Sequence, residues 1–167
     1  VLGGDERAVN LIQEALPVEL QAVTRTITSG RAVDGSEERR DEDVARFVRS
    51  AVAEETVELI QAFQDHGGSR AQAANGAGDT IRALQRAQVD VLLVHDGAAT
   101  GRIGWIAEGP GMVALDETEL EHLGGKDRVS GRLTDVAVLA ALRTGASVRV
   151  IPDASAVEDG LGALLRW

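Results

Sequence analysis

The chain has 167 residues, with 27 acidic and 17 basic side chains and no cysteine. This length suffices for one domain of ordinary size, or for one domain with part of a neighbour, and needs no covalent cross-link. The lack of cysteine excludes disulfides, thiolate nucleophiles and cysteine-ligated metals. A net charge of −10 disfavours bulk binding to nucleic acid or to anionic membranes, so an RNA contact requires a local basic patch.

The first 27 residues predict a strand, a helix and a second strand. Residues 1–4 resemble the end of a strand, and residues 5–16 have apolar side chains at helical spacing up to Pro17. Residues 19–27 alternate well enough for a strand. This unit is too small to stand alone, and the chain starts without methionine. We therefore expect a C-terminal piece of a longer protein.

A linker and a long helix follow. Residues 28–36 are polar with two glycines, which is typical of a surface loop or an interdomain joint. Residues 37–66 carry one apolar stripe that ends at Gly67-Gly68, and a helix of this length extends about 43 Å. Such a helix is either the backbone of a single domain or a connector between two domains.

The last hundred residues alternate between helix and strand patterns. The predicted elements are a helix over 70–87 interrupted near 76–78, a buried strand over 89–94, weak strands or a hairpin over 97–111, a short helix over 116–123, a polar loop over 124–130, a helix over 133–145, a second buried strand over 147–151 and a third strand from 160. This order predicts an α/β fold, a helix-sheet-helix sandwich with a mixed sheet.

Catalytic and metal-binding motifs are sparse. His66, His95 and His122 stand far apart with no partner at metal-ligand spacing, so neither a metal nor a cofactor is expected. His95-Asp96 follows a predicted strand, where open α/β sheets often hold ligands. One alternative is therefore a hydrolase that uses this pair, although no Gly-x-Ser-x-Gly motif accompanies it.

Lys126, Arg128 and Arg132 form a local basic cluster in the otherwise acidic chain. They could contact phosphates, which makes a structured-RNA-binding module a second alternative. The competing interpretation is an ordinary exposed loop at the start of a helix.

Four segments in order resemble the C-terminal domain of archaeal and eukaryotic class I peptide chain release factors and their relative Pelota. They are Thr80-Ile81-Arg82-Ala83-Leu84, Val89-Asp90-Val91-Leu92-Leu93-Val94, Ser147-Val148-Arg149-Val150-Ile151 and Gly160-Leu161-Gly162-Ala163-Leu164-Leu165-Arg166-Trp167. The last segment resembles the glycine-rich Leu-Arg-Tyr ending of that family, with Trp167 in place of tyrosine.

The tail motif also has a structural interpretation. Gly160 and Gly162 allow close passage of a neighbouring element, whereas Leu161, Ala163 and Leu165 alternate inward. We therefore expect these residues to close a sheet.

The resemblance implies four parts of the chain. Residues 1–28 would be the strand-helix-strand end of the middle domain, 29–36 a linker, 37–66 a connector helix and 67–167 the C-terminal domain. The Gly-Gly-Gln loop that such factors use for peptide release does not occur in this sequence.

The resemblance also implies a cytoplasmic role at the ribosome. Because this chain lacks the Gly-Gly-Gln loop, we expect it to have no enzymatic role of its own. The factor would act in rescue, termination or hibernation, with this chain as a partner-binding module. The implied partners are the ribosome and a translational GTPase such as EF-Tu, and rRNA through the basic cluster.

Overall fold

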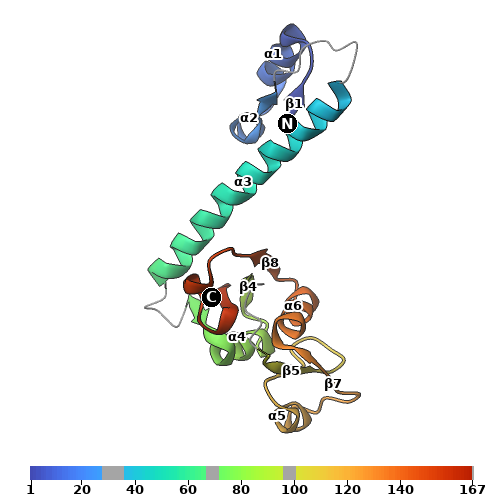
Figure 1. The fold of residues 1–167 in the computed structure, drawn as a ribbon, viewed down its shortest axis with the longest axis vertical. Coiled ribbons are helices and arrows are strands. Elements are labelled where there is room, and N and C mark those ends of the chain that lie inside the picture. Colours follow the sequence, from blue (N-terminus) through green and yellow to red (C-terminus); the bar gives the residue numbers. More distant parts are fainter. Residues whose placement is uncertain (28–35, 67–71, 96–100, 167) are drawn as a thin grey trace. The chain divides into compact units, whose positions relative to one another are not determined.

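The computed structural model describes residues 1–27, 36–66, 72–95 and 101–166 (Figure 1). The chain forms two compact units, Val1–Glu55 and Thr56–Trp167, and the boundary between them falls inside one long helix. The predicted linker over 29–36 lies outside the described residues except for its last residue.

The first unit contains a parallel pair of short strands connected through two helices. Its elements are β1 (Leu2–Gly3), α1 (Glu6–Ala15), α2 (Val18–Val23) and β2 (Thr26–Ile27), followed by the first part of α3 (Ser36–His66). The Asp5 carboxylate caps α1 because it accepts hydrogen bonds from the backbone N–H groups of Arg7 (3.0 Å) and Ala8 (3.4 Å). The strand and helix predicted over 1–16 are confirmed.

The strand predicted over 19–27 is wrong in its first half, which forms α2. Pro17 precedes the first turn of this helix, where a residue without an N–H group costs no hydrogen bond. Gln21 Nε2 donates to the Leu16 carbonyl at 2.7 Å, and Thr24 Oγ1 donates to the Leu20 carbonyl at 2.6 Å. These local bonds prevail over a weak alternation of side chains.

The long helix predicted over 37–66 is confirmed as α3. Within the second unit its last turns bury Thr56 and Phe63, which lie on one helical face with the half-buried Ile60. Within the first unit, Val48 and Val52 of the predicted apolar stripe are exposed.

A four-stranded mixed sheet forms the centre of the second unit, in the order β3-β9-β4-β8. Its strands are β3 (Ala73–Asn75), β4 (Val89–Val94), β8 (Ser147–Val150) and β9 (Leu161–Leu165). β9 is antiparallel to both β3 and β4, whereas β4 and β8 are parallel. The predicted mixed sheet is confirmed.

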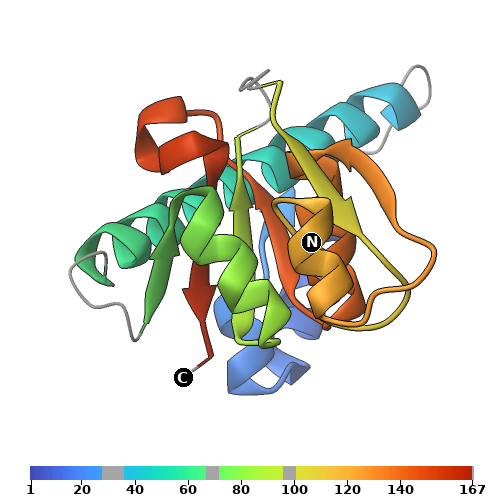
Figure 2. The same ribbon diagram turned by 90° about the horizontal axis from the view of Figure 1, so that it is seen from below.

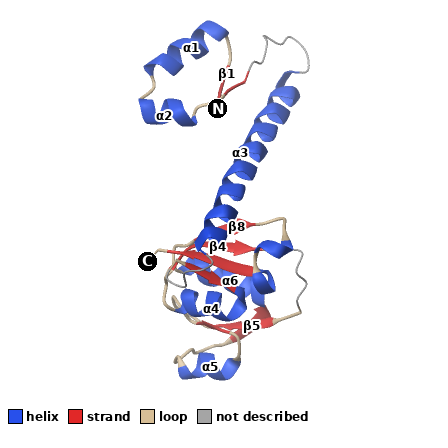
Figure 3. Cartoon of the chain, turned by 90° about the vertical axis from the view of Figure 1, so that its left-hand side faces the viewer, coloured by secondary structure: helices blue, strands red, loops and turns tan. Residues whose placement is uncertain are grey.

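Helices cover both faces of this sheet. Helices α4 (Gly76–Gln85) and α6 (Leu133–Arg143) pack on one face and lie on the same side of the sheet in Figure 3. Figure 2 shows α4, in green, in front of the strands of this sheet. On the other face, Phe63 of α3 packs with Leu93, Ile151 and Val157. The predicted helix-sheet-helix sandwich is therefore confirmed.

A second, three-stranded sheet extends from the sandwich in the order β6-β5-β7. Its elements are β5 (Ile103–Ile106), β6 (Val113–Ala114), α5 (Glu117–His122) and β7 (Val129–Arg132). Ala107, Ala114 and Leu120 form its own small core. The predicted short helix is confirmed. The predicted hairpin forms from β5 and β6, but β6 lies beyond the predicted range of 97–111.

Two strands contradict the predictions. Ala73–Asn75 lies in the region expected to be helical but forms β3, because it pairs with β9 and because Gly76 has a left-handed φ of 80° that interrupts a continuous helix. Val129–Arg132 overlaps the predicted polar loop but forms β7, which pairs with β5. Both strands depend on distant partners, so local sequence patterns do not reveal them.

The strand predicted to be buried over 147–151 is an edge strand. β8 pairs with β4 on one side, and the Val150 side chain at its end is 60% exposed. Its apolar residues therefore gave a misleading indication of burial.

We predict that Thr80→Val stabilises the second unit. Thr80 on α4 is fully buried, and its hydroxyl has no hydrogen-bond partner among the described residues. Valine has nearly the same shape without the unsatisfied oxygen, so the free energy of unfolding rises by about 1 kcal/mol. Urea unfolding followed by circular dichroism measures the change.

Thr144→Val is the matched control with the opposite sign. Its hydroxyl lies 3.1 Å from the Ala140 carbonyl and 3.0 Å from the Ala141 carbonyl, so valine here removes a hydrogen bond that is made. A loss of stability in Thr80→Val equal to that in Thr144→Val contradicts the prediction.

Candidate partner-binding surface

The terminal strand β9 packs unusually close to α3. A Cβ atom on Gly162 would lie 2.7 Å from Val157 Cγ1 and 2.9 Å from Phe63 Cζ, which is too close for a side chain. On the opposite face of β9, Leu161, Ala163 and Leu165 pack against the larger core. Glycine at position 162 thus allows the helix and the strand to pack directly on each other.

Arg166 joins the end of β9 to the end of α6. Its Nη2 atom donates to the carbonyl oxygens of Gly145 (2.9 Å) and Thr144 (3.3 Å), and its Nε lies 3.7 Å from an Asp90 carboxylate oxygen. A cation at a helix C-terminus satisfies free carbonyl groups and interacts favourably with the helix dipole. The sequence motif contains this arginine but gives no sign of its partners. Trp167 lies outside the described residues.

A second set of bonds joins the segment before β9 to the start of α4. Asn75 Oδ1 accepts a hydrogen bond from the Glu158 backbone N–H at 2.9 Å. Asp159 accepts one from the Ala77 N–H at 3.4 Å and pairs with Arg102 at 2.5 Å. Asp159 has a left-handed φ of 54°, which is uncommon for a residue with a side chain. These contacts hold the α4 start, the terminal segment and the start of β5 together.

The predicted basic cluster is largely compensated by carboxylates. Arg132 donates through Nε (3.0 Å) and Nη2 (2.9 Å) to the two carboxylate oxygens of Asp135. Arg128 donates to the Gly125 carbonyl at 3.1 Å and lies 3.3 Å from a Glu117 oxygen. Lys126 is exposed on the loop between α5 and β7. Two of the three cations therefore already have anionic partners, and RNA binding by this cluster stays a prediction.

His95 lies half-buried at the end of β4. Its backbone N–H donates to the Gly160 carbonyl at 3.0 Å, and its ring Nδ1 lies 3.1 Å from the Ile151 carbonyl oxygen. Both contacts attach the end of β4 to neighbouring segments. Asp96 lies outside the described residues, so the hydrolase hypothesis stays a prediction.

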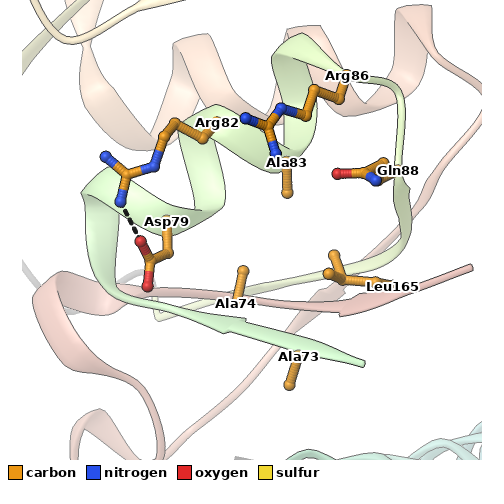
Figure 4. A pocket seen from close by; sticks show the side chains of 8 residues that line it. All are labelled: Ala73, Ala74, Asp79, Arg82, Ala83, Arg86, Gln88 and Leu165. Atoms are coloured by element: carbon orange, nitrogen blue, oxygen red, sulfur yellow. Dashed lines mark hydrogen bonds and ion pairs between the residues drawn. The ribbon is translucent and has the colours of Figure 1, made fainter. Parts of the chain in front are cut away.

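A hollow of about 280 Å³ lies between α4 and the strands β3 and β9 (Figure 4). Ala74, Ala83 and Leu165 contribute apolar surface to it, while Arg82 and Arg86 extend along α4 above them. Sequence reasoning missed this hollow because β3 was expected to be helical.

In the described part of the chain, no group of three or more histidine and acidic residues could hold a metal ion. No described helix is long and apolar enough to cross a membrane.

Residues 1–69 match the family model of bacterial archaeo-eukaryotic release factor family 2. The matched part is the first unit and the long helix, not the segments that carry the resemblance in the last hundred residues. No curated protein matches the chain.

Several solved structures have a similar fold. The C-terminal domain of the peptide chain release factor from Methanosarcina mazei aligns with a TM-score of 0.55 and 12% identity, over 83% of this chain and 98% of that domain. Pelota in a model of ribosome-bound archaeal Pelota and ABCE1 aligns with a TM-score of 0.57 and 18% identity, over 99% of this chain and 42% of that protein. Archaeoglobus fulgidus Pelota aligns with a TM-score of 0.47 and 19% identity, over 99% of this chain and 47% of that protein.

The chain therefore has the fold of the C-terminal region of release factors and Pelota. It spans less than half the length of the Pelota chains that it matches.

We predict that Gly162→Ala destabilises the second unit. The added methyl group overlaps Val157 and Phe63, and overpacking of this kind costs about 1–3 kcal/mol. The free energy of unfolding in urea measures the loss, and the second substitution Val157→Ala should restore part of it.

Gly78→Ala serves as the control. Position 78 lies in α4, and an added Cβ there meets only the Arg82 guanidinium, at 3.9 Å and beyond. Alanine at this site should stabilise the helix by about 0.5–1 kcal/mol. Equal effects at the two glycines would contradict the packing argument.

We also predict that Asp135 titrates unusually low. The hydrogen bonds from Arg132, aided by its charge, lower the pKa of the Asp135 carboxyl below its usual value. A lowered folded-state pKa stabilises the fold above the unfolded pKa, and this contribution is lost as pH falls through the folded pKa. Carboxyl ¹³C NMR titration measures the midpoint.

Arg132→Gln should raise the Asp135 midpoint towards its usual value, whereas Lys126→Gln should leave it nearly unchanged. An unchanged midpoint in Arg132→Gln shows that the ion pair does not form in solution.

Proposed function

We propose that the chain is part of a ribosome-associated, release-factor-like translation factor that acts in rescue, termination or hibernation. Within it, this chain serves as a partner-binding module without a catalytic role of its own. The observation that carries the proposal is the fold match over 98% of a release factor C-terminal domain. The family-model match over residues 1–69 supports it independently.

The proposed organisation has four parts. Residues 1–28 end an upstream middle domain, 29–36 link it to the connector helix over 37–66, and 67–167 form the C-terminal domain. Two two-residue strands do not make a stable sheet by themselves, and Leu11 and Val18 in the first unit are exposed. Both features are expected of a unit completed by further strands.

A protein is favoured over RNA as the direct partner of the second unit. The chain carries a net charge of −10, and Arg128 and Arg132 are paired with carboxylates. The α6 helix also exposes Leu139 and Leu142 to solvent. Apolar side chains on a surface are suited to a protein interface and contribute little to phosphate binding. A translational GTPase such as EF-Tu is the proposed partner.

Co-sedimentation of the full-length protein with ribosomes, together with an EF-Tu pull-down, tests the proposal. We expect the protein in the ribosomal fraction and EF-Tu in the pull-down. Absence from both overturns the proposal.

The double variant Lys126→Gln/Arg132→Gln separates protein from RNA as the direct contact. If the direct partner is a protein, the double variant should co-sediment to the same extent as the natural protein, and with the same salt dependence. A weaker, less salt-dependent association in the double variant assigns the contact to RNA instead.

A further inference from the structure

The hollow beneath α4 has an apolar floor and a charged rim. Ala74 and Ala83 are nearly fully buried, and their small side chains leave space beside Leu165. Arg82 lies on α4 and Arg86 at its C-cap, about one helical turn further on, and both side chains lean towards the start of the helix above this floor (Figure 4). The hollow can therefore receive a side chain with both an aliphatic and a polar part.

The two arginines differ in their availability. Arg82 pairs with Asp79, three residues earlier on the same helix, so its charge is largely compensated. The backbone N–H of Arg86 donates to the Arg82 carbonyl at 3.3 Å, whereas its guanidinium has no hydrogen bond or ion pair among the described residues, and the residue is exposed. The rim therefore carries about one uncompensated positive charge, located on Arg86.

Gln88 adds a neutral amide at the end of the hollow. Its backbone carbonyl is already used, because it accepts a hydrogen bond from the Arg166 N–H at 2.9 Å. Figure 4 shows the side-chain amide on the hollow side with its oxygen towards the hollow, and a 180° rotation of the amide places the NH₂ group there. A guanidinium and a primary amide together suit a carboxylate, since both donate hydrogen bonds to its oxygens.

The surroundings favour a carboxylate side chain over a nucleic-acid phosphate. A phosphate backbone is bound by several cations, whereas this rim offers one free cation beside the Asp79 carboxylate. The alanine and leucine floor gains nothing from a phosphate but can pack against the methylene groups of a glutamate.

We propose that this hollow binds a glutamate side chain from an extended acidic segment of a protein partner. Arg86 and the Gln88 amide hold the carboxylate, and Ala74, Ala83 and Leu165 contact the methylene groups. The proposal builds on the partner-binding role proposed above and names the chemistry of that partner.

NMR titration of the ¹⁵N-labelled 167-residue chain tests the proposal. The probe is an acetylated, amidated hexapeptide of alternating glutamate and leucine, and the control is the same peptide with glutamine for glutamate. We expect amide shifts at Ala83, Arg86 and Gln88 with the glutamate peptide only. Shifts confined to other regions, or equal shifts with both peptides, overturn the proposal.

Three variants make the test specific. Arg86→Gln should lower the affinity for the glutamate peptide about tenfold, as expected for the loss of a charge-assisted contact. Arg49→Gln removes the same charge from an exposed position on α3 and should leave binding unchanged.

Asp79→Asn should strengthen binding, because it removes a negative charge from the rim and frees Arg82. A merely structural role for these residues would not give effects of opposite sign. Weaker binding in Asp79→Asn contradicts the proposed electrostatics.

Two further probes distinguish other ligands. A uridine hexanucleotide and inorganic phosphate should cause no saturable shifts in the hollow, and saturable binding of either one there overturns the assignment to a glutamate side chain. The titration needs no ribosome, so its outcome is separate from co-sedimentation. Peptide binding without ribosome association supports the proposed glutamate site and overturns the proposed function. Ribosome association without peptide binding overturns only the proposed glutamate site.

Discussion

The sandwich in the second unit depends on the close contact between β9 and α3 at Gly162. β9 lies between β3 and β4, so it is hydrogen-bonded at both edges. Apolar side chains of the two core clusters cover both of its faces. Any side chain at position 162 would push Phe63 and Val157 away from the sheet. β9 is therefore the strand that joins β3 to the β4–β8 pair. Leu161, Gly162 and Ala163 therefore have a structural role in the sheet.

Polar contacts at the ends of β9 attach the remaining elements to this centre. Arg166 connects the C-terminal end of β9 to carbonyl groups at the end of α6. Asp159, two residues before the start of β9, hydrogen-bonds to the start of α4 and pairs with Arg102. The orientation of α4 over β3 follows from these attachments, and the hollow lies between those two elements. A binding surface on this side of the domain is thus positioned by the same strand that completes the core.

The basic cluster and the hollow beneath α4 differ in whether their arginines are paired with carboxylates, more than in how many cations they contain. Arg128, Arg132 and Arg82 all have carboxylate partners, so their fields are largely cancelled locally. Arg86 keeps its charge above an apolar floor. One uncompensated arginine next to a hollow provides a more selective contact for an acidic protein segment than a paired cluster provides for RNA.

Periodicity alone predicted α3, β4, α6 and the strand character of β9, because each contains enough apolar residues at one spacing to define its own face. The resemblance seen in the last hundred residues agrees with the fold. The sequence did not reveal β3 and β7, because their short, small or polar segments become strands only by pairing with β9 and β5. For the same reason the sequence shows which residues are arginines, but it does not show which of them are free to bind a ligand. Whether an arginine is paired depends on which carboxylates the tertiary fold brings within hydrogen-bond distance of it.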